Sequence, residues 1–246
     1  MNSTQSTANT QITVETNESS AEPAENAEPI KNTAEAIENT VGSTKNTVEA
    51  AEISEQVALQ AEPQSRAGER SLHLTVAYDG AQYFGWQKQP DQLTVQEVLE
   101  RGLSIATGQK NVRTLASSRT DTGVHAIAQS VLFKSTHWPA PAERLPYAVN
   151  TSLPPDIVVR KCEEVSPYFH PLRDSTGKRY RYLIYNARKE DPLGRAQHWW
   201  VRRRLDLEQM QIAAAFIEGE HDFNSFQSTG SPRSSTIRIV RELAIH

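Results

Sequence analysis

The sequence contains very little cysteine and no long apolar run. Cys162 is the single cysteine among 246 residues, so no disulfide can form within the chain, which is typical of a reducing compartment such as the cytoplasm. No stretch approaches the ~18 consecutive apolar residues that a membrane helix needs, so we expect no membrane insertion. The sequence also lacks zinc-like cysteine and histidine spacings and nucleotide-binding motifs.

The first 70 residues lack tryptophan, tyrosine, phenylalanine and aspartate. They contain four basic residues and twelve glutamates, a net charge of −8, whereas residues 71–246 carry a net charge of +4. Without large apolar side chains, this segment cannot bury enough surface to offset a backbone entropy cost of roughly 1–2 kcal/mol per residue. We predict that residues 1–70 form a disordered acidic extension.

The remainder of the chain contains a regular succession of apolar periodicities. Residues 94–108 are typical of an amphipathic helix, because Thr94 and Glu97 form a capping box and Gly108 can end the helix in a left-handed conformation. A second helix is expected after Asp206. Alternating residues predict strands within 71–80, 111–117, 126–133, 156–165, 178–186 and 235–246. Helices separated by pairs of strands predict an α+β fold, which we divide into halves at 71–175 and 176–246.

A polar segment, "SSRTDTGVH" at residues 117–125, connects two of these predicted strands. Gly123 can adopt a positive φ without steric cost, so Asp121 would project from a rigid turn, as a catalytic carboxylate must. Arg119 can pair with that carboxylate or with a phosphate. The same residues are also compatible with an ordinary Asx turn, and His125 with a hydrogen-bonded structural role.

Three segments place basic residues next to aromatic ones: "KRYRY" at 178–182, Trp86 with Lys88, and Arg202–Arg204 after two tryptophans. Aromatic faces can stack on nucleobases while Lys and Arg contact phosphates, so this pattern favours a nucleic acid as partner. The alternatives are a row of core tyrosines on an edge strand and an arginine run that is only a solvated face.

Six segments, in this order, resemble the tRNA pseudouridine synthase A family. They are "YDGAQYFGWQKQP", "TVQEVLERGLS", "SRTDTGVHAIAQ", "VNTSLPPDIVV", "FHPLRDSTGKRYRYLIYN" and "GEHDFNSFQS". The resemblance implies a pseudouridine-synthase fold, with two mixed or antiparallel α+β halves around a central cleft. It also implies a cytoplasmic homodimer that needs no cofactor or metal and isomerises uridine to pseudouridine in the anticodon stem-loop of tRNA, at positions 38 to 40.

The family motifs assign roles to three residues of this sequence. Asp121 matches the catalytic aspartate and is expected to act as the nucleophile, while Tyr180 and Arg119 match the substrate-binding tyrosine and arginine. The chain departs from the family pattern around the aspartate, where Ser118 replaces a glycine and Thr122 replaces an alanine. Both replacements are small, so the assignment is retained.

Two other functions remain open at this point. Family members continue beyond the last segment, so we expect the second half to be incomplete and its last strand to have an uncovered edge. The protein could then be a catalytically weak or inactive RNA-binding remnant of such an enzyme. A hydrolase built from Ser118, Asp121 and His125 is a further alternative, although no nucleophile-elbow pattern supports it.

Overall fold

A computed structural model describes residues 8–17, 68–227 and 235–246 of the chain. Within 8–17 it describes the side chains of Ile12 and Thr13. The fold is α+β, as predicted, and the chain separates into two units: residues 21–171, and residues 1–20 together with 172–246. The division falls a few residues before the expected boundary at 175. None of the helices in the described ranges is long and apolar enough to cross a membrane.

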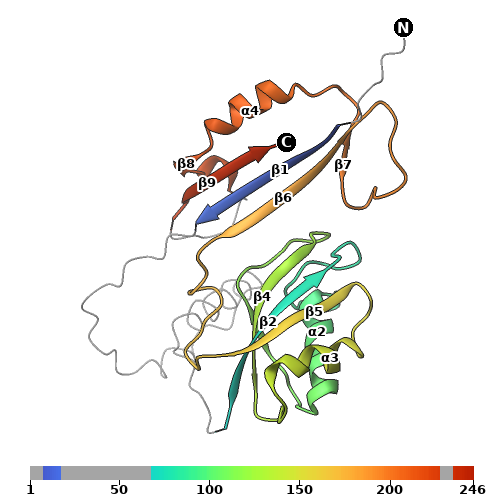
Figure 1. Ribbon diagram of the computed structural model, residues 1–246, viewed down its shortest axis with the longest axis vertical. Coiled ribbons are helices and arrows are strands. Elements are labelled where there is room, and N and C mark those ends of the chain that lie inside the picture. The colour runs from blue at the N-terminus through green and yellow to red at the C-terminus, as the bar shows by residue number, and fades with distance from the viewer. Residues whose placement is uncertain (1–7, 18–67, 228–234) are drawn as a thin grey trace, which may run out of the picture. The chain divides into compact units, whose positions relative to one another are not determined.

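The unit of residues 21–171 contains an antiparallel sheet with the strand order β3-β4-β2-β5 (Figure 1). Its strands are β2 (Arg70–Tyr78), β3 (Thr114–Ala116), β4 (Ala126–Ser135) and β5 (Ile157–Val165). In the register, Leu74 of β2 lies between Val131 of β4 and Cys162 of β5. Cys162 is therefore a core residue, and burial raises the pKa of its thiol to about 12. A thiol that stays protonated is a poor nucleophile, so this cysteine is structural.

Helix α2 (Val95–Thr107) confirms the amphipathicity, the left-handed end and the Thr94 half of the predicted capping box. Thr94 Oγ1 accepts a hydrogen bond from the Glu97 N–H at 3.4 Å, and Gly108 ends the helix with a φ of 71°. The apolar stripe of the helix packs on one face of the sheet, against alternate residues of β2. The buried residues of this contact are Leu72, Leu74, Val76, Val95, Val98, Leu99 and Leu103.

Between β4 and β5 the chain folds into η1 (Ala142–Arg144) and α3 (Leu145–Asn150). Helix α3 packs beside α2 and against β5, so the two helices form one layer over the sheet. The glycine inside α2 has a packing reason, because a Cβ at Gly102 would lie 2.7 Å from Leu153 Cδ2 just after α3. Gly102 thus lowers helix propensity but allows this close approach.

A buried carboxylate joins α2 to the start of β3. Glu100 Oε1 accepts hydrogen bonds from the Thr114 N–H at 2.8 Å, from Thr114 Oγ1 at 3.1 Å and from Gln96 Nε2 at 3.2 Å. Glu100 is 8% exposed and Thr114 is equally buried. The carboxylate thereby satisfies donors that would otherwise be buried without partners, and it fixes where β3 enters the sheet.

The second unit contains a five-stranded mixed sheet with the order β7-β6-β1-β9-β8 (Figure 1). Its strands are β1 (Ala8–Asn17), β6 (Lys178–Asn186), β7 (Trp199–Val201), β8 (Gly219–Asp222) and β9 (Ile237–Ile245). Strands β6 and β7 are parallel and the other pairs are antiparallel. A short helical turn, η2 (Asn224–Phe226), follows β8.

Strand β1 differs from the sequence-based expectation, which placed residues 1–70 in a disordered extension. It pairs with β6 from Ala8↔Asn186 to Thr16↔Lys178, and with β9 from Ile12↔Ile245 to Asn17↔Ile239. Ladder hydrogen bonds use backbone groups that any residue supplies, so an apolar-poor segment can still be a central strand. Residues 1–7 and 18–67 lie outside the described residues, and disorder there stays a prediction.

The last strand also differs from expectation. Strand β9 is paired with β1 on one side and with β8 on the other, so the uncovered edge predicted for it does not form. The predicted helix after Asp206 is present as α4 (Leu207–Ala215), with Asp206 Oδ1 accepting from the Gln209 N–H at 3.1 Å. Ala214 is its one buried residue, so this helix buries little of its surface.

Candidate active site

The polar segment between β3 and β4 forms a turn whose two ends are fixed by the pairing of these strands. The strands pair from Thr114↔Phe133 to Ala116↔Val131, and one further backbone bond follows, from the Ser117 N–H to Ser130 O at 2.9 Å. Gln129 Nε2 then donates to Ser118 O. Gly123 adopts a φ of 80°, as predicted, and the Val124 N–H donates to Asp121 O at 3.1 Å. The turn therefore starts at a fixed point of the sheet and closes on itself.

The loop that follows β2, residues 79–86, supports the turn from a second side. The Trp86 N–H donates to Thr120 O at 2.9 Å, and the Gly123 N–H donates to the main-chain oxygen of Tyr83 at 3.2 Å. Two glycines allow this contact: a Cβ at Gly85 would lie 2.5 Å from Thr120 O, and a Cβ at Gly80 would lie 2.0 Å from Val124 O. Side chains at either position would push the loop away from the turn. Sequence reasoning missed this support, because a contact between residues about 40 apart leaves no local pattern.

The turn carries three ionisable side chains, those of Arg119, Asp121 and His125. Arg119 and Asp121 are both exposed, so the carboxylate can reach a bound molecule. His125 Nδ1 lies 2.9 Å from Asp79 Oδ1 and 3.2 Å from the Gly80 nitrogen. One ring nitrogen cannot donate to the carboxylate and accept from the N–H at once, so the tautomer selects one partner. Either way His125 has a hydrogen-bonded structural role, and the imidazole contacts the loop after β2 instead of forming the Ser118–Asp121–His125 triad of the hydrolase alternative.

Tyr180 lies in the other unit, on β6, which has the predicted bounds. Tyr180 is 47% exposed and Tyr182 is 63% exposed, while Ile184 on the same side is buried. The alternative of a core tyrosine row is therefore wrong for these two residues. Exposed aromatic rings are suited to stacking on nucleobases, while the exposed Arg179 and Arg181 alternate with them along β6 and lie on its other face.

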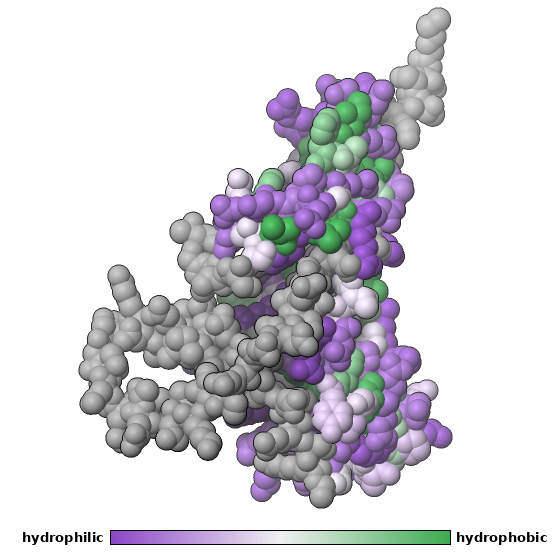
Figure 2. All heavy atoms as spheres, turned by 90° about the vertical axis from the view of Figure 1, so that its left-hand side faces the viewer, coloured by the Kyte–Doolittle hydropathy of each residue, from purple (hydrophilic) through white to green (hydrophobic). Residues whose placement is uncertain are grey.

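The other two basic and aromatic segments have different outcomes. Trp86 is 3% exposed and packs in the core beside Tyr78, so its predicted role next to Lys88 in base stacking is wrong. Arg202–Arg204 are exposed just after β7, which is compatible with phosphate contacts and with a solvated face. Hydrophilic residues cover most of the described surface that Figure 2 presents, and apolar residues appear there in separate patches.

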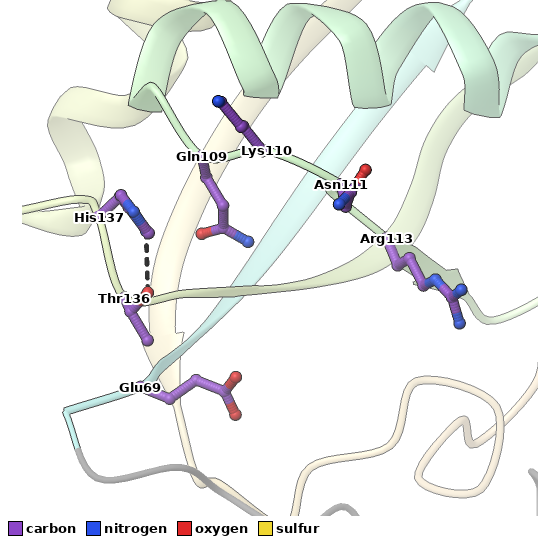
Figure 3. Close-up of a pocket in the computed structure, with 7 residues that line it drawn as sticks. All are labelled: Glu69, Gln109, Lys110, Asn111, Arg113, Thr136 and His137. Atoms are coloured by element: carbon purple, nitrogen blue, oxygen red, sulfur yellow. Dashed lines mark hydrogen bonds between the residues drawn. The ribbon is translucent and has the colours of Figure 1, made fainter.

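A cavity of about 490 Å³ lies at the end of the first sheet where β2 and β3 begin and β4 ends (Figure 3). Its lining is Glu69, Gln109, Lys110, Asn111, Arg113, Thr136 and His137. The turn of residues 117–125 follows the opposite end of β3, so the cavity does not contain Arg119 or Asp121. Within the described ranges, no group of three or more histidine, cysteine, aspartate or glutamate side chains is placed to hold a metal ion.

Comparison with known proteins shows which family the chain is part of. Residues 74–172 match the family model described as tRNA pseudouridine synthase. Over 176 residues the chain is 44% identical to tRNA pseudouridine synthase A of Thermoanaerobacter pseudethanolicus, and 42% identical to the proteins of that name from Acetivibrio thermocellus and Geobacter sulfurreducens. Each match covers 72% of this chain and 71% of the relative. The chain belongs to the tRNA pseudouridine synthase A family.

Membership of the tRNA pseudouridine synthase A family confirms the resemblance found in the sequence and makes the chain an isomerase. The matched range contains the turn, including Arg119 and Asp121, and the loop that supports it. Tyr180 follows the range matched by the family model. The structure thus places two of the three candidate residues in one turn of one unit, and the third on a strand of the other unit.

Proposed function

We propose that this protein isomerises uridine to pseudouridine in the anticodon stem-loop of tRNA, at positions 38 to 40, with Asp121 as the nucleophile. Family membership supports a tRNA pseudouridine synthase, and it does not favour the alternative of an inactive binding remnant. The observation that carries the role of Asp121 is the exposed carboxylate on a turn supported by both flanking strands and by the loop after β2. A group held in this way needs no rearrangement before it reacts.

The chemistry suits a single carboxylate. The N1–C1′ bond of uridine breaks, the base turns, and C5 bonds to C1′, while N1 gains a proton and C5 loses one. Atoms and electrons balance without an oxidant, water or an energy source. An ionised Asp121 can attack C1′, which leaves the base held by non-covalent contacts while it turns, or C6, which keeps the base bonded to the carboxylate. In either case the bond to Asp121 breaks before the product leaves, so the carboxylate is regenerated.

We assign substrate binding to Arg119 and Tyr180, each by the surface that it offers. Arg119 is two residues before Asp121 and can contact a phosphate of the bound nucleotide. Tyr180 presents a half-exposed ring that can stack on an unpaired base. Such stacking would offset part of the few kcal/mol that it costs to remove the base from its helical stack. Sequence-independent phosphate contacts from the exposed arginines of the second unit fit recognition of a folded RNA by its shape.

The test measures tritium release from C5-labelled uridine in tRNA, together with tRNA affinity. Asp121→Asn keeps the shape of the side chain but removes the nucleophile, so we expect release to stop while tRNA affinity stays within a few fold. Tyr180→Phe separates stacking from hydroxyl chemistry, because a stacking role leaves the rate nearly unchanged. Substantial turnover by purified Asp121→Asn would refute the role of Asp121.

A further inference from the structure

Thr120, the residue just before the proposed nucleophile, makes two hydrogen bonds to residues outside the turn. Thr120 O accepts the Trp86 N–H at 2.9 Å, and Thr120 Oγ1 lies 2.8 Å from the hydroxyl oxygen of Tyr78. The first bond fixes the main chain and the second fixes the side chain, so Thr120 has little freedom to rotate. The direction in which Asp121 leaves the turn depends on the backbone of its neighbour.

Tyr78 is itself firmly placed. It is the last residue of β2, is 4% exposed, and its ring packs against Trp86 with centroids 5.9 Å apart. Burial raises the pKa of its phenol, an effect that the Thr120 hydrogen bond opposes, so the hydroxyl stays protonated and available for this bond. The buried ring of Tyr78 thus fixes the position of its hydroxyl, which bonds to Thr120 in the turn.

We propose that Tyr78 is a positioning residue for catalysis, whose hydroxyl fixes Thr120 and thereby sets the orientation of the Asp121 carboxylate. The inference rests on the proposed role of Asp121. Tyr78 touches neither the substrate nor the reacting atoms in this scheme. Because a displacement of about 1 Å in a reacting group can cost on the order of 100-fold in rate, loss of this bond should lower kcat and leave the binding of tRNA unchanged.

The chain offers a matched control in Tyr83. Tyr83 is 3% exposed in the same region, and its hydroxyl also makes one partly buried hydrogen bond, donating to Asp156 Oδ1 at 2.7 Å. Asp156 lies just before β5 and outside the turn. The bond from Gly123 goes to the main-chain oxygen of Tyr83, which a phenylalanine keeps. Tyr78→Phe and Tyr83→Phe therefore each remove the hydroxyl of a buried tyrosine, and only Tyr78→Phe removes one that bonds directly to a residue of the turn.

The experiment measures kcat and KM for pseudouridine formation, with thermal unfolding of each full-length variant. We expect Tyr78→Phe to lower kcat at least ten-fold at unchanged KM, and Tyr83→Phe to stay within about two-fold of the original protein. Thr120→Val, which lacks the hydroxyl, should reproduce the loss, and Thr120→Ser, which keeps it, should retain activity. Tyr78→Phe combined with Thr120→Val should be no worse than either change alone, because both remove the same bond. Thr120→Val removes the bond from the turn side, so it decides the matter if Tyr78→Phe does not fold.

Asp121→Asn, measured in the same assay, separates failure of the inference from failure of the proposed function. If Asp121→Asn remains active, the proposed nucleophile is wrong and the role of Tyr78 is overturned with it. If Asp121→Asn is inactive but Tyr78→Phe matches Tyr83→Phe and Thr120→Val is fully active, Tyr78 is only a core residue.

Discussion

Removal of the Glu100 carboxylate should destabilise the first unit and displace the start of β3. In Glu100→Ala the Thr114 N–H, which donates to Glu100 Oε1 at 2.8 Å, would stay buried without a partner. An unsatisfied buried donor costs about 1–3 kcal/mol, and the Thr114 hydroxyl and the Gln96 amide lose an acceptor as well. We expect a total loss of about 2–4 kcal/mol, because these two groups can find other partners more easily.

The expected loss corresponds to a fall in Tm of roughly 8–32 °C, since about 1 kcal/mol shifts the Tm of a domain near 100 residues by 4–8 °C. Scanning calorimetry or denaturant unfolding measures it. Glu97→Ala is the control, because it removes a carboxylate from the same helix, in its first turn, at a cost of about 0.3–1 kcal/mol. Glu100→Gln keeps one acceptor oxygen and should lose less than Glu100→Ala. Equal Tm values for Glu100→Ala and Glu97→Ala would refute the reasoning.

Two further predictions concern β1 and an ion pair. Deletion of residues 1–20 should remove hydrogen-exchange protection from amides of β6 and β9, because β1 lies between these two strands, and should leave the amides of β2 protected. Deletion of residues 1–7 is the control. Unchanged protection of β6 and β9 would show that β1 is dispensable. Glu164 accepts from Arg70 at 2.7 Å, and this bond lowers the pKa of its carboxyl. The stability it contributes is therefore present above the ordinary glutamate pKa of about 4.3 and is lost as pH falls. The Tm difference between the original protein and Glu164→Gln should disappear in acid, and a difference that persists at pH 2 would contradict the assignment.

Local patterns determined several elements by themselves. The bounds of α2 follow from Thr94 and Gly108, since capping and left-handed termination depend on residues within one helical turn. The sequence likewise indicated β6 and the turn around Asp121, because alternation and a glycine with positive φ are local properties. The motifs around that turn also indicated the family, which the comparisons confirm.

Only the tertiary structure decided the remaining features, and each depends on contacts between distant parts of the chain. Residues 8–17 lack the apolar content of a core strand, yet they pair with β6 and β9 through backbone groups, which carry no sequence signal. Trp86 next to Lys88 has the pattern of a base-stacking residue, but the loop after β2 folds inward and buries its side chain. The bonds from Tyr78 to Thr120 and from Glu100 to Thr114 join residues 42 and 14 positions apart. Nothing in the spacing of these residues marks them as partners, because their meeting depends on how the sheet and helix pack.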